Sequence, residues 1–96
     1  MRYETRRGIV RLNICGVVFL TPTRKEMNNC SAFLQLNMFN SIIWQFLSEN
    51  KSIDDVYNLF SRMISNKQHG QEHIKEIIDR NLNEMIEKGY IIRIED

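Results

Sequence analysis

Histidine and cysteine are the residue types here best suited to metal binding or nucleophilic chemistry, and the sequence has two of each. His69 and His73 are four residues apart, as in a metal-binding pair on one helix face, but Gly70 lies between them and no third ligand is near in sequence. Cys15 and Cys30 form no CxxC pair and follow no signal peptide, so we expect both to be reduced. Hydrolase, phosphate-loop and zinc-protease motifs do not occur. We therefore expect no enzymatic activity, no metal and no cofactor.

Length and composition indicate one globular domain over residues 1–96. The chain is 43% hydrophobic and 26% charged, with one proline and four glycines, which is typical of a folded protein. Its longest apolar run is Val17 to Leu20, much too short to span a membrane. We expect a cytoplasmic protein with no membrane partner.

Three segments in the first third have the pattern of strands. Residues 8–14 alternate in polarity, and Cys15-Gly16 can form a tight connection to a second strand over residues 17–20. The polar segment 21–29 is then a loop in which Pro22 ends the pairing, and residues 31–36 form the third strand. These segments predict a three-stranded antiparallel meander.

Three helices are expected after the meander. The first begins at Asn37 or Asn40 and runs to about residue 49. The second follows a capping box at Ser52-Ile53-Asp54-Asp55, and a linker over residues 66–70 precedes the third, which runs over about 71–88 and ends at Gly89. Residues 90–94 alternate again, as in a short terminal strand. The predicted fold class is α+β, a three-stranded antiparallel meander followed by a three-helix bundle.

The apolar face of the third predicted helix is unusually wide. Four residues form an ordinary core stripe and two more widen it: Ile74, Ile78, Leu82 and Met85, then Ile77 and Ile86. Asn81 falls inside the widened face, where an unpaired and dry amide would be costly. Either the helix is packed on two sides with Asn81 bonded to a neighbour, or this face is one wall of an open groove.

The charges argue against nucleic acid as a partner. Residues 1–30 carry +4 and the remainder −3, and the third predicted helix carries three cationic against five acidic residues. A helix that enters a DNA groove needs a cationic excess. A DNA-binding winged-helix regulator stays as an alternative, because three helices with small strands also describe that fold.

The third predicted strand is an edge of the meander. Residues 31–36 contain no proline or lysine, the residues that usually protect such an edge, so its backbone is a template for an added strand. Two alternatives remain: the terminal strand covers this edge, or the edge pairs with itself as an oligomerisation module. The oligomeric state is left open.

The order of several short motifs resembles the PqqD family. The likeness spans residues 6–91 and is carried by Arg7 to Leu12, Val17 to Pro22, Leu36-Asn37, Trp44, Phe46-Leu47, Ser52 to Val56, Leu82, Met85 and Gly89-Tyr90. The resemblance implies a peptide chaperone or recognition element for ribosomally made, post-translationally modified peptides. Such domains bind the leader segment of a precursor peptide as an added strand and present it to a radical SAM maturase or a leader peptidase.

The resemblance also implies a set of peptide-binding residues. The third strand would pair with the leader backbone through Ala32, Phe33, Leu34, Gln35 and Leu36. The third helix would form the opposite wall with Ile74, Ile77, Ile78, Asn81 and Met85.

Overall fold

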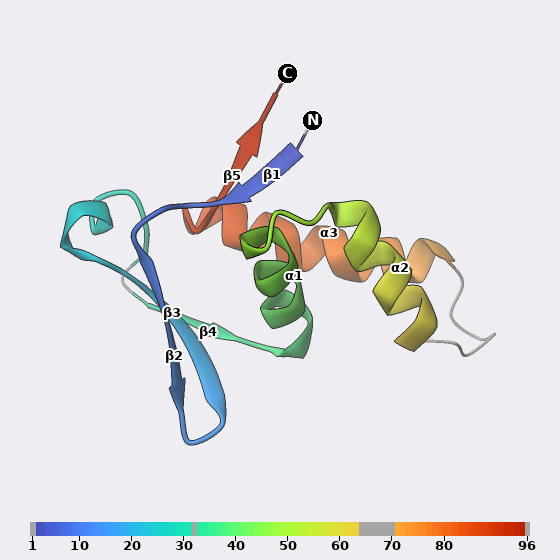
Figure 1. Ribbon diagram of the computed structural model, residues 1–96, viewed down its shortest axis with the longest axis horizontal. Helices are drawn as coiled ribbons and strands as arrows, with labels where there is room; N and C mark the ends of the chain where they lie inside the picture. The colour runs from blue at the N-terminus through green and yellow to red at the C-terminus, as the bar shows by residue number, and fades with distance from the viewer. Residues whose placement is uncertain (1, 32, 64–70, 96) are drawn as a thin grey trace.

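The computed structural model describes residues 2–31, 33–63 and 71–95, and it confirms the predicted α+β fold (Figure 1). The expected meander, three helices and terminal strand are all present, with a further strand at the N-terminus. The prediction that Pro22 ends the pairing of the second strand is wrong, because that strand runs through Pro22, which lies opposite Ile9. In chain order the elements are β1 (Arg2–Thr5), β2 (Ile9–Ile14), β3 (Val17–Pro22), a short 3-10 helix (Arg24–Glu26), β4 (Leu34–Leu36), α1 (Met38–Ser48), α2 (Ile53–Met63), α3 (Gln71–Glu87) and β5 (Ile91–Ile94). The linker predicted over residues 66–70 lies outside the described residues, as do Ala32 and His69.

β2, β3 and β4 form an antiparallel sheet in that order. Cys15 and Gly16 join β2 to β3 with φ angles of 52° and 83°, the left-handed pair of a type I′ turn. Such a turn makes Ile14 and Val17 a hydrogen-bonded pair, and hydrogen-bonded pairs alternate along an antiparallel ladder. Odd-numbered residues of β3 therefore direct their backbone groups to β2, and even-numbered ones to β4.

β4 is shorter than predicted, covering 34–36 and not 31–36. It pairs with Val18 to Leu20 of β3. The next even-numbered residue of β3 is Pro22, which has no N–H to donate to a longer β4. The ladder therefore ends at Leu34.

β1 and β5 form a second antiparallel sheet that joins the two ends of the described chain (Figure 1). Arg2 lies opposite Ile94 and Thr5 opposite Ile91, and the N–H of Arg6 extends the pairing by donating to Tyr90 O at 2.9 Å. The alternative in which the terminal strand covers the edge of the meander is thus wrong, because β5 pairs with β1.

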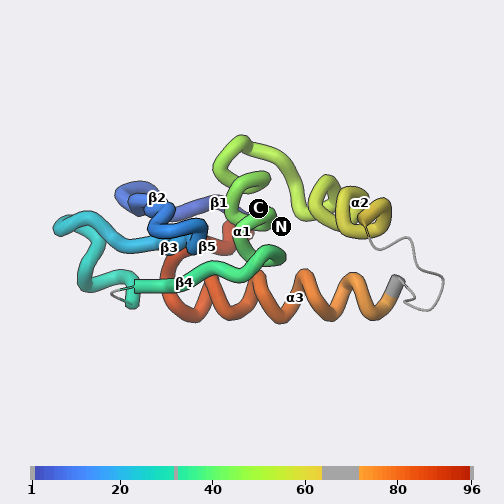
Figure 2. Tube along the Cα trace, turned by 90° about the horizontal axis from the view of Figure 1, so that it is seen from below, coloured from blue at the N-terminus to red at the C-terminus, as the bar shows by residue number. Residues whose placement is uncertain are grey.

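The core lies between the helices and the inner face of the sheet. α1 packs against both α2 and α3, and Figure 2 shows α1 and α2 on the same side of α3. Among the described residues the buried apolar side chains are Leu20, Leu34, Leu36, Ile43, Trp44, Leu47, Val56, Phe60, Ile74, Ile77, Ile78, Leu82, Met85, Tyr90 and Ile91. The capping box predicted for α2 is confirmed, since Asp55 N and Ser52 Oγ are 3.2 Å apart and Ser52 N donates to Asp55 Oδ2 at 2.9 Å.

Gly89 ends α3 as predicted, and two constraints require glycine there. Its φ of +87° is the left-handed conformation of a helix C-terminal cap. A Cβ at this position would also lie 2.1 Å from Asn29 O. The backbone before β4 can therefore lie directly against the end of α3.

Tyr90 connects this end of α3 to the sheet. Its side chain is fully buried, and its hydroxyl donates to Ser31 O and lies 3.3 Å from Leu20 O. Burial raises the pKa of the Tyr90 hydroxyl, so the group stays a hydrogen-bond donor. The N–H of Ser31 in turn donates to Lys88 O at 3.0 Å.

Gly89→Ala should destabilise the fold by at least about 3 kcal/mol, because it adds a backbone clash to the cost of a left-handed alanine. Gly16→Ala is the matched control: its φ is +83°, but nothing lies within 4 Å of an added Cβ, so its cost should be about 1–2 kcal/mol. Urea denaturation followed by circular dichroism measures both. Equal losses for the two variants would contradict the close approach at Gly89.

Candidate peptide-binding edge

The outer edge of β4 is not paired with any strand in the described part of the chain. One side of β4 bonds to β3, and the side chains of Leu34 and Leu36 point into the core. The intervening Gln35 is exposed. β4 is therefore anchored on its inner face and open along one edge.

The phase of the ladder decides which backbone groups this edge presents. Because even-numbered residues of β3 bond toward β4, the pairs Val18–Leu36 and Leu20–Leu34 are the hydrogen-bonded ones. The N–H of Thr23 donates to Gly8 O at 2.7 Å. Thr23 is odd-numbered and Gly8 directly precedes β2, so this bond agrees with the assignment of odd-numbered residues of β3 to the β2 side. The N–H and C=O of Gln35 consequently point away from β3, toward the open edge.

Both ends of the segment that contains β4 are fastened to α3. At one end the Ser31–Lys88 backbone bond holds the chain at the end of the helix. At the other end, Asn37 Nδ2 donates to Asn81 Oδ1 at 3.0 Å. The segment that contains β4 is thus held to α3 at both of its ends.

Asn37 has a second role that explains the direct passage from strand to helix. Its Oδ1 accepts from Asn40 N at 2.9 Å, so Asn37 is the N-cap of α1. Of the two predicted start residues, Asn37 and Asn40, the helix is thus capped by the first. Asn81 is held from its other side, because its Nδ2 donates to Ile77 O at 2.7 Å. One amide therefore fixes the end of β4, the start of α1 and the middle of α3 together.

The structure favours the interpretation in which α3 is packed on two sides and Asn81 is bonded to a neighbour. Ile77 is 8% exposed and Ile74, Ile78 and Met85 are 3% or less, so these four predicted groove residues form part of the core. Asn81 is only partly buried and is bonded to a neighbouring element, as that interpretation expects. Of the predicted wall residues, Asn81 is the one that reaches the surface beside β4.

The residues predicted to form the peptide-binding strand differ in how far their side chains are buried. Leu34 and Leu36 are buried, Gln35 is exposed, and Ala32 lies outside the described residues. Phe33 precedes β4 and is 52% exposed, with its ring centroid 4.6 Å from that of Phe19. The sequence gives no direct signal for this pair, because the two phenylalanines are brought together only by the register of β3 and β4.

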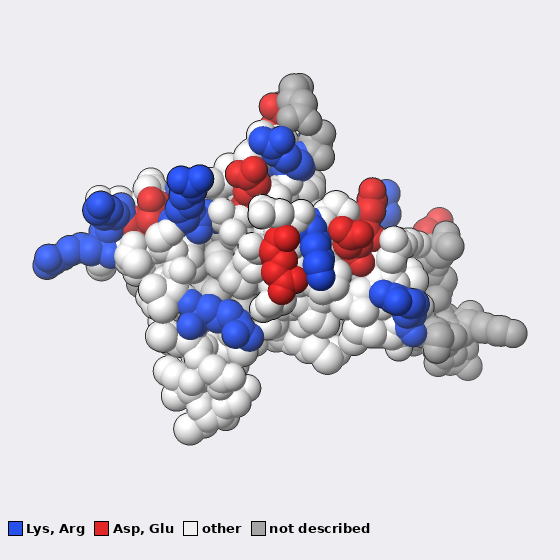
Figure 3. All heavy atoms as spheres, viewed as in Figure 1, with Lys and Arg blue, Asp and Glu red and all other residues white. Residues whose placement is uncertain are grey.

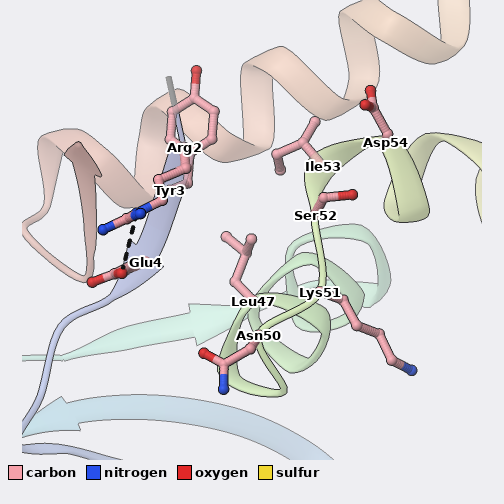
Figure 4. Close-up of a pocket in the computed structure, with 9 residues that line it drawn as sticks. All are labelled: Arg2, Tyr3, Glu4, Leu47, Asn50, Lys51, Ser52, Ile53 and Asp54. Atoms are coloured by element: carbon pink, nitrogen blue, oxygen red, sulfur yellow. Dashed lines mark ion pairs between the residues drawn. The ribbon is translucent and has the colours of Figure 1, made fainter. Parts of the chain in front are cut away.

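Two cavities in the described part of the chain lie away from this edge. A hollow of about 520 Å³ opens between β1 and the turn that joins α1 to α2, and Figure 4 shows charges of both signs around it. A smaller one of about 280 Å³ lies between α2 and α3. Neither is lined by a residue of β4, so the candidate site is an edge and not a pocket.

Other chemistry is weakly represented in the described ranges. They contain no group of three histidine, cysteine or acidic residues placed to hold a metal ion. Cys15 and Cys30 are both free thiols, and burial raises the pKa of the Cys30 thiol. None of the described helices combines the length and apolar character needed to cross a membrane.

A comparison with solved structures finds a similar fold in a protein that was solved with a bound peptide. The chain is similar to TbiB1, solved in complex with the TbiA(beta) leader peptide, with a TM-score of 0.74 over 97% of this chain and 99% of the other. The two sequences are 16% identical, so the likeness is one of fold. No protein-family model matches the sequence, and no curated protein matches it significantly.

Asn37→Ala should lower the free energy of unfolding by about 1–2 kcal/mol, since it removes both the cap and the bond to Asn81. Asn37→Asp separates these two roles: its carboxylate can still cap α1, but it has no amide to donate to Asn81. We expect Asp to retain most of the stability and to change the amide chemical shifts around Asn81. Chemical denaturation and two-dimensional NMR provide the measurements. Asp and Ala variants of equal stability would mean that the cap contributes little.

Proposed function

We propose that this protein binds the leader segment of a ribosomally synthesised precursor peptide by strand addition to β4 and presents it to a modifying enzyme. The observation that supports this most directly is the open edge of β4, which directs the N–H and C=O of Gln35 outward and is held at both ends against α3. Strand addition takes its affinity from such backbone groups and its selectivity from alternating side chains.

The geometry suggests how a leader would be selected. Successive side chains of an added strand point to opposite faces of the sheet. Those on the inner side would approach α3 near Asn81, and those on the outer side would lie beside Gln35 and Phe33. We expect affinity in the nanomolar to micromolar range, or roughly −8 to −12 kcal/mol.

The named partner of TbiB1 supports the choice of ligand. That protein has been solved with a leader peptide, and its fold matches almost all of this chain. We propose by analogy that a precursor leader is the peptide here. A radical SAM maturase or a leader peptidase would then carry out the chemistry, and this domain would position the substrate without a cofactor of its own.

Gln35→Pro is the sharpest test of the binding edge. It removes an N–H that points outward and leaves the bonds to β3 in place, so the fold should persist, as edge strands tolerate proline. We expect at least a tenfold weaker affinity, measured by fluorescence anisotropy, for a fluorescein-labelled synthetic leader to be identified from a precursor gene that neighbours this one. Gln35→Ala, which keeps the N–H, is the control and should bind within about threefold of the unaltered protein.

Leu34→Pro completes the set, because Leu34 bonds to β3 and a proline there should unfold the sheet. Unchanged binding by Gln35→Pro, with a native circular dichroism spectrum, would overturn strand addition at this edge. A mass by light scattering that rises with concentration and falls to the monomer value in Gln35→Pro would show instead that the edge pairs with a second copy.

A further inference from the structure

The outer face of the β2–β3–β4 sheet is apolar and uncovered. Its side chains follow from the register, since residues opposite one another on an antiparallel sheet share a face. We call it the outer sheet face; it carries the polar Thr21 and Gln35, and its six apolar side chains are Val10, Leu12, Ile14, Val17, Phe19 and Phe33. None of these six side chains belongs to the core or packs against it.

The exposure of this face is unexpected from the alternation of apolar and polar residues in β2. Val10, Leu12 and Ile14 form the more apolar face of the strand, and such a face ordinarily packs on a core. Here the core side of the sheet is the one with Arg11 and Asn13, because Leu20 and Leu34 point that way. Ile14 is left 51% exposed and Val10 39%.

The size of the face is informative about what covers it. Two strands of six residues, with β4 and Phe33 beside them, give a sheet of roughly 250 Å² in projection at about 3.3 Å per residue and a strand spacing of about 4.8 Å. A stable interface buries about 800 Å² on each partner. The outer sheet face by itself is therefore too small for a stable interface with any partner, whether a second copy of this chain or an enzyme, but it approaches the few hundred Å² that exposed apolar patches of monomers rarely exceed.

An added strand would enlarge the face. A leader bound at the open edge of β4 becomes the next strand of the same sheet, and every second side chain of the leader then lies on the outer side, continuous with Phe33 and Gln35. The enlarged surface exists only when the leader is bound.

The charges beside the face indicate the character of the partner. Arg7, Arg24 and Lys25 are exposed at the end of the sheet opposite the β2–β3 turn. Figure 3 shows cationic side chains gathered at that end, whereas the tip of the hairpin is uncharged in this view. The nearest carboxylate of the short helix, Glu26, is already 3.5 Å from Arg6.

We propose that the outer sheet face is the docking surface for the enzyme that acts on the bound peptide, and that the bound leader forms part of this surface. The enzyme would contribute an apolar patch bordered at one end by carboxylates. The proposal rests on the proposed function, since the leader is the strand that completes the face. It explains why apolar residues are kept exposed on the side away from the core. It also makes enzyme recruitment depend on the leader.

Ile14→Lys tests the docking surface without touching the leader edge, because Ile14 lies two strands away from it. Met63→Lys is the matched control, since Met63 is 47% exposed on α2 and is not part of the face. The reagents are a fluorescein-labelled synthetic leader and the purified modifying enzyme, each to be identified from the genes that neighbour this one. Anisotropy measures leader affinity, and biolayer interferometry measures enzyme binding with and without saturating leader.

We expect the unaltered protein to bind the enzyme at least tenfold more tightly with leader than without it. Ile14→Lys should weaken enzyme binding at least tenfold and leave leader affinity within twofold, whereas Met63→Lys should change neither. Val10→Lys provides a second variant on the face with the same expectation.

Two results would overturn the docking proposal while leaving leader binding intact. One is normal enzyme recruitment by Ile14→Lys and Val10→Lys. The other is a dimer of the unaltered protein that Ile14→Lys dissociates in sedimentation equilibrium, which would assign the face to a second copy. If the unaltered protein binds no leader, the proposed function fails, and the docking proposal fails with it.

Discussion

The position of β4 depends on the hydrogen bonds that fasten the chain on either side of it to α3. At one end the missing side chain of Gly89 lets the backbone at Asn29 approach the helix, and Tyr90 bonds to Ser31 from inside the core. At the other end Asn37 bonds to Asn81. An edge held at both ends has already lost much of its conformational freedom. A peptide that pairs with it therefore has less ordering to offset than it would on a loose segment.

The short length of β4 limits unwanted pairing at its open edge. An uncovered edge strand invites pairing with other chains, and proteins commonly limit this by keeping such strands short. β4 has three residues, and Pro22 on the neighbouring strand prevents a longer ladder. The same proline that restricts the edge thus limits unwanted pairing, while the outward groups of Gln35 stay accessible to a specific strand.

Local signals predicted the helices well, because their determinants lie close together in sequence. The cap at Asn37, the Ser52–Asp55 box and the stop at Gly89 each depend on a few neighbouring residues, and all three are present. β1 lacked such a signal: it is four residues long with charged Arg2 and Glu4, and its partner β5 lies near the other end of the sequence. Pairings of this kind are decided by tertiary structure, which overrides local pattern.

The candidate site was predictable only in part for the same reason. The existence of an edge follows from the order of the strands. Which backbone groups that edge presents depends on the phase of the ladder, and this phase is set by the turn at Cys15-Gly16, at the start of the neighbouring strand β3. The wide face of α3 was a real feature of the sequence, but whether its isoleucines were buried depended on how closely α1 and α2 packed against it.

The pairing of β1 with β5 brings the first and last described residues to the same side of the molecule, away from β4 (Figure 1). A polypeptide joined to either end would leave the domain on that side. Fluorescent proteins, affinity handles or an entire catalytic domain can therefore be attached at either terminus without obstructing β4. The architecture is in this sense modular, suited equally to a free adaptor and to one unit of a larger chain.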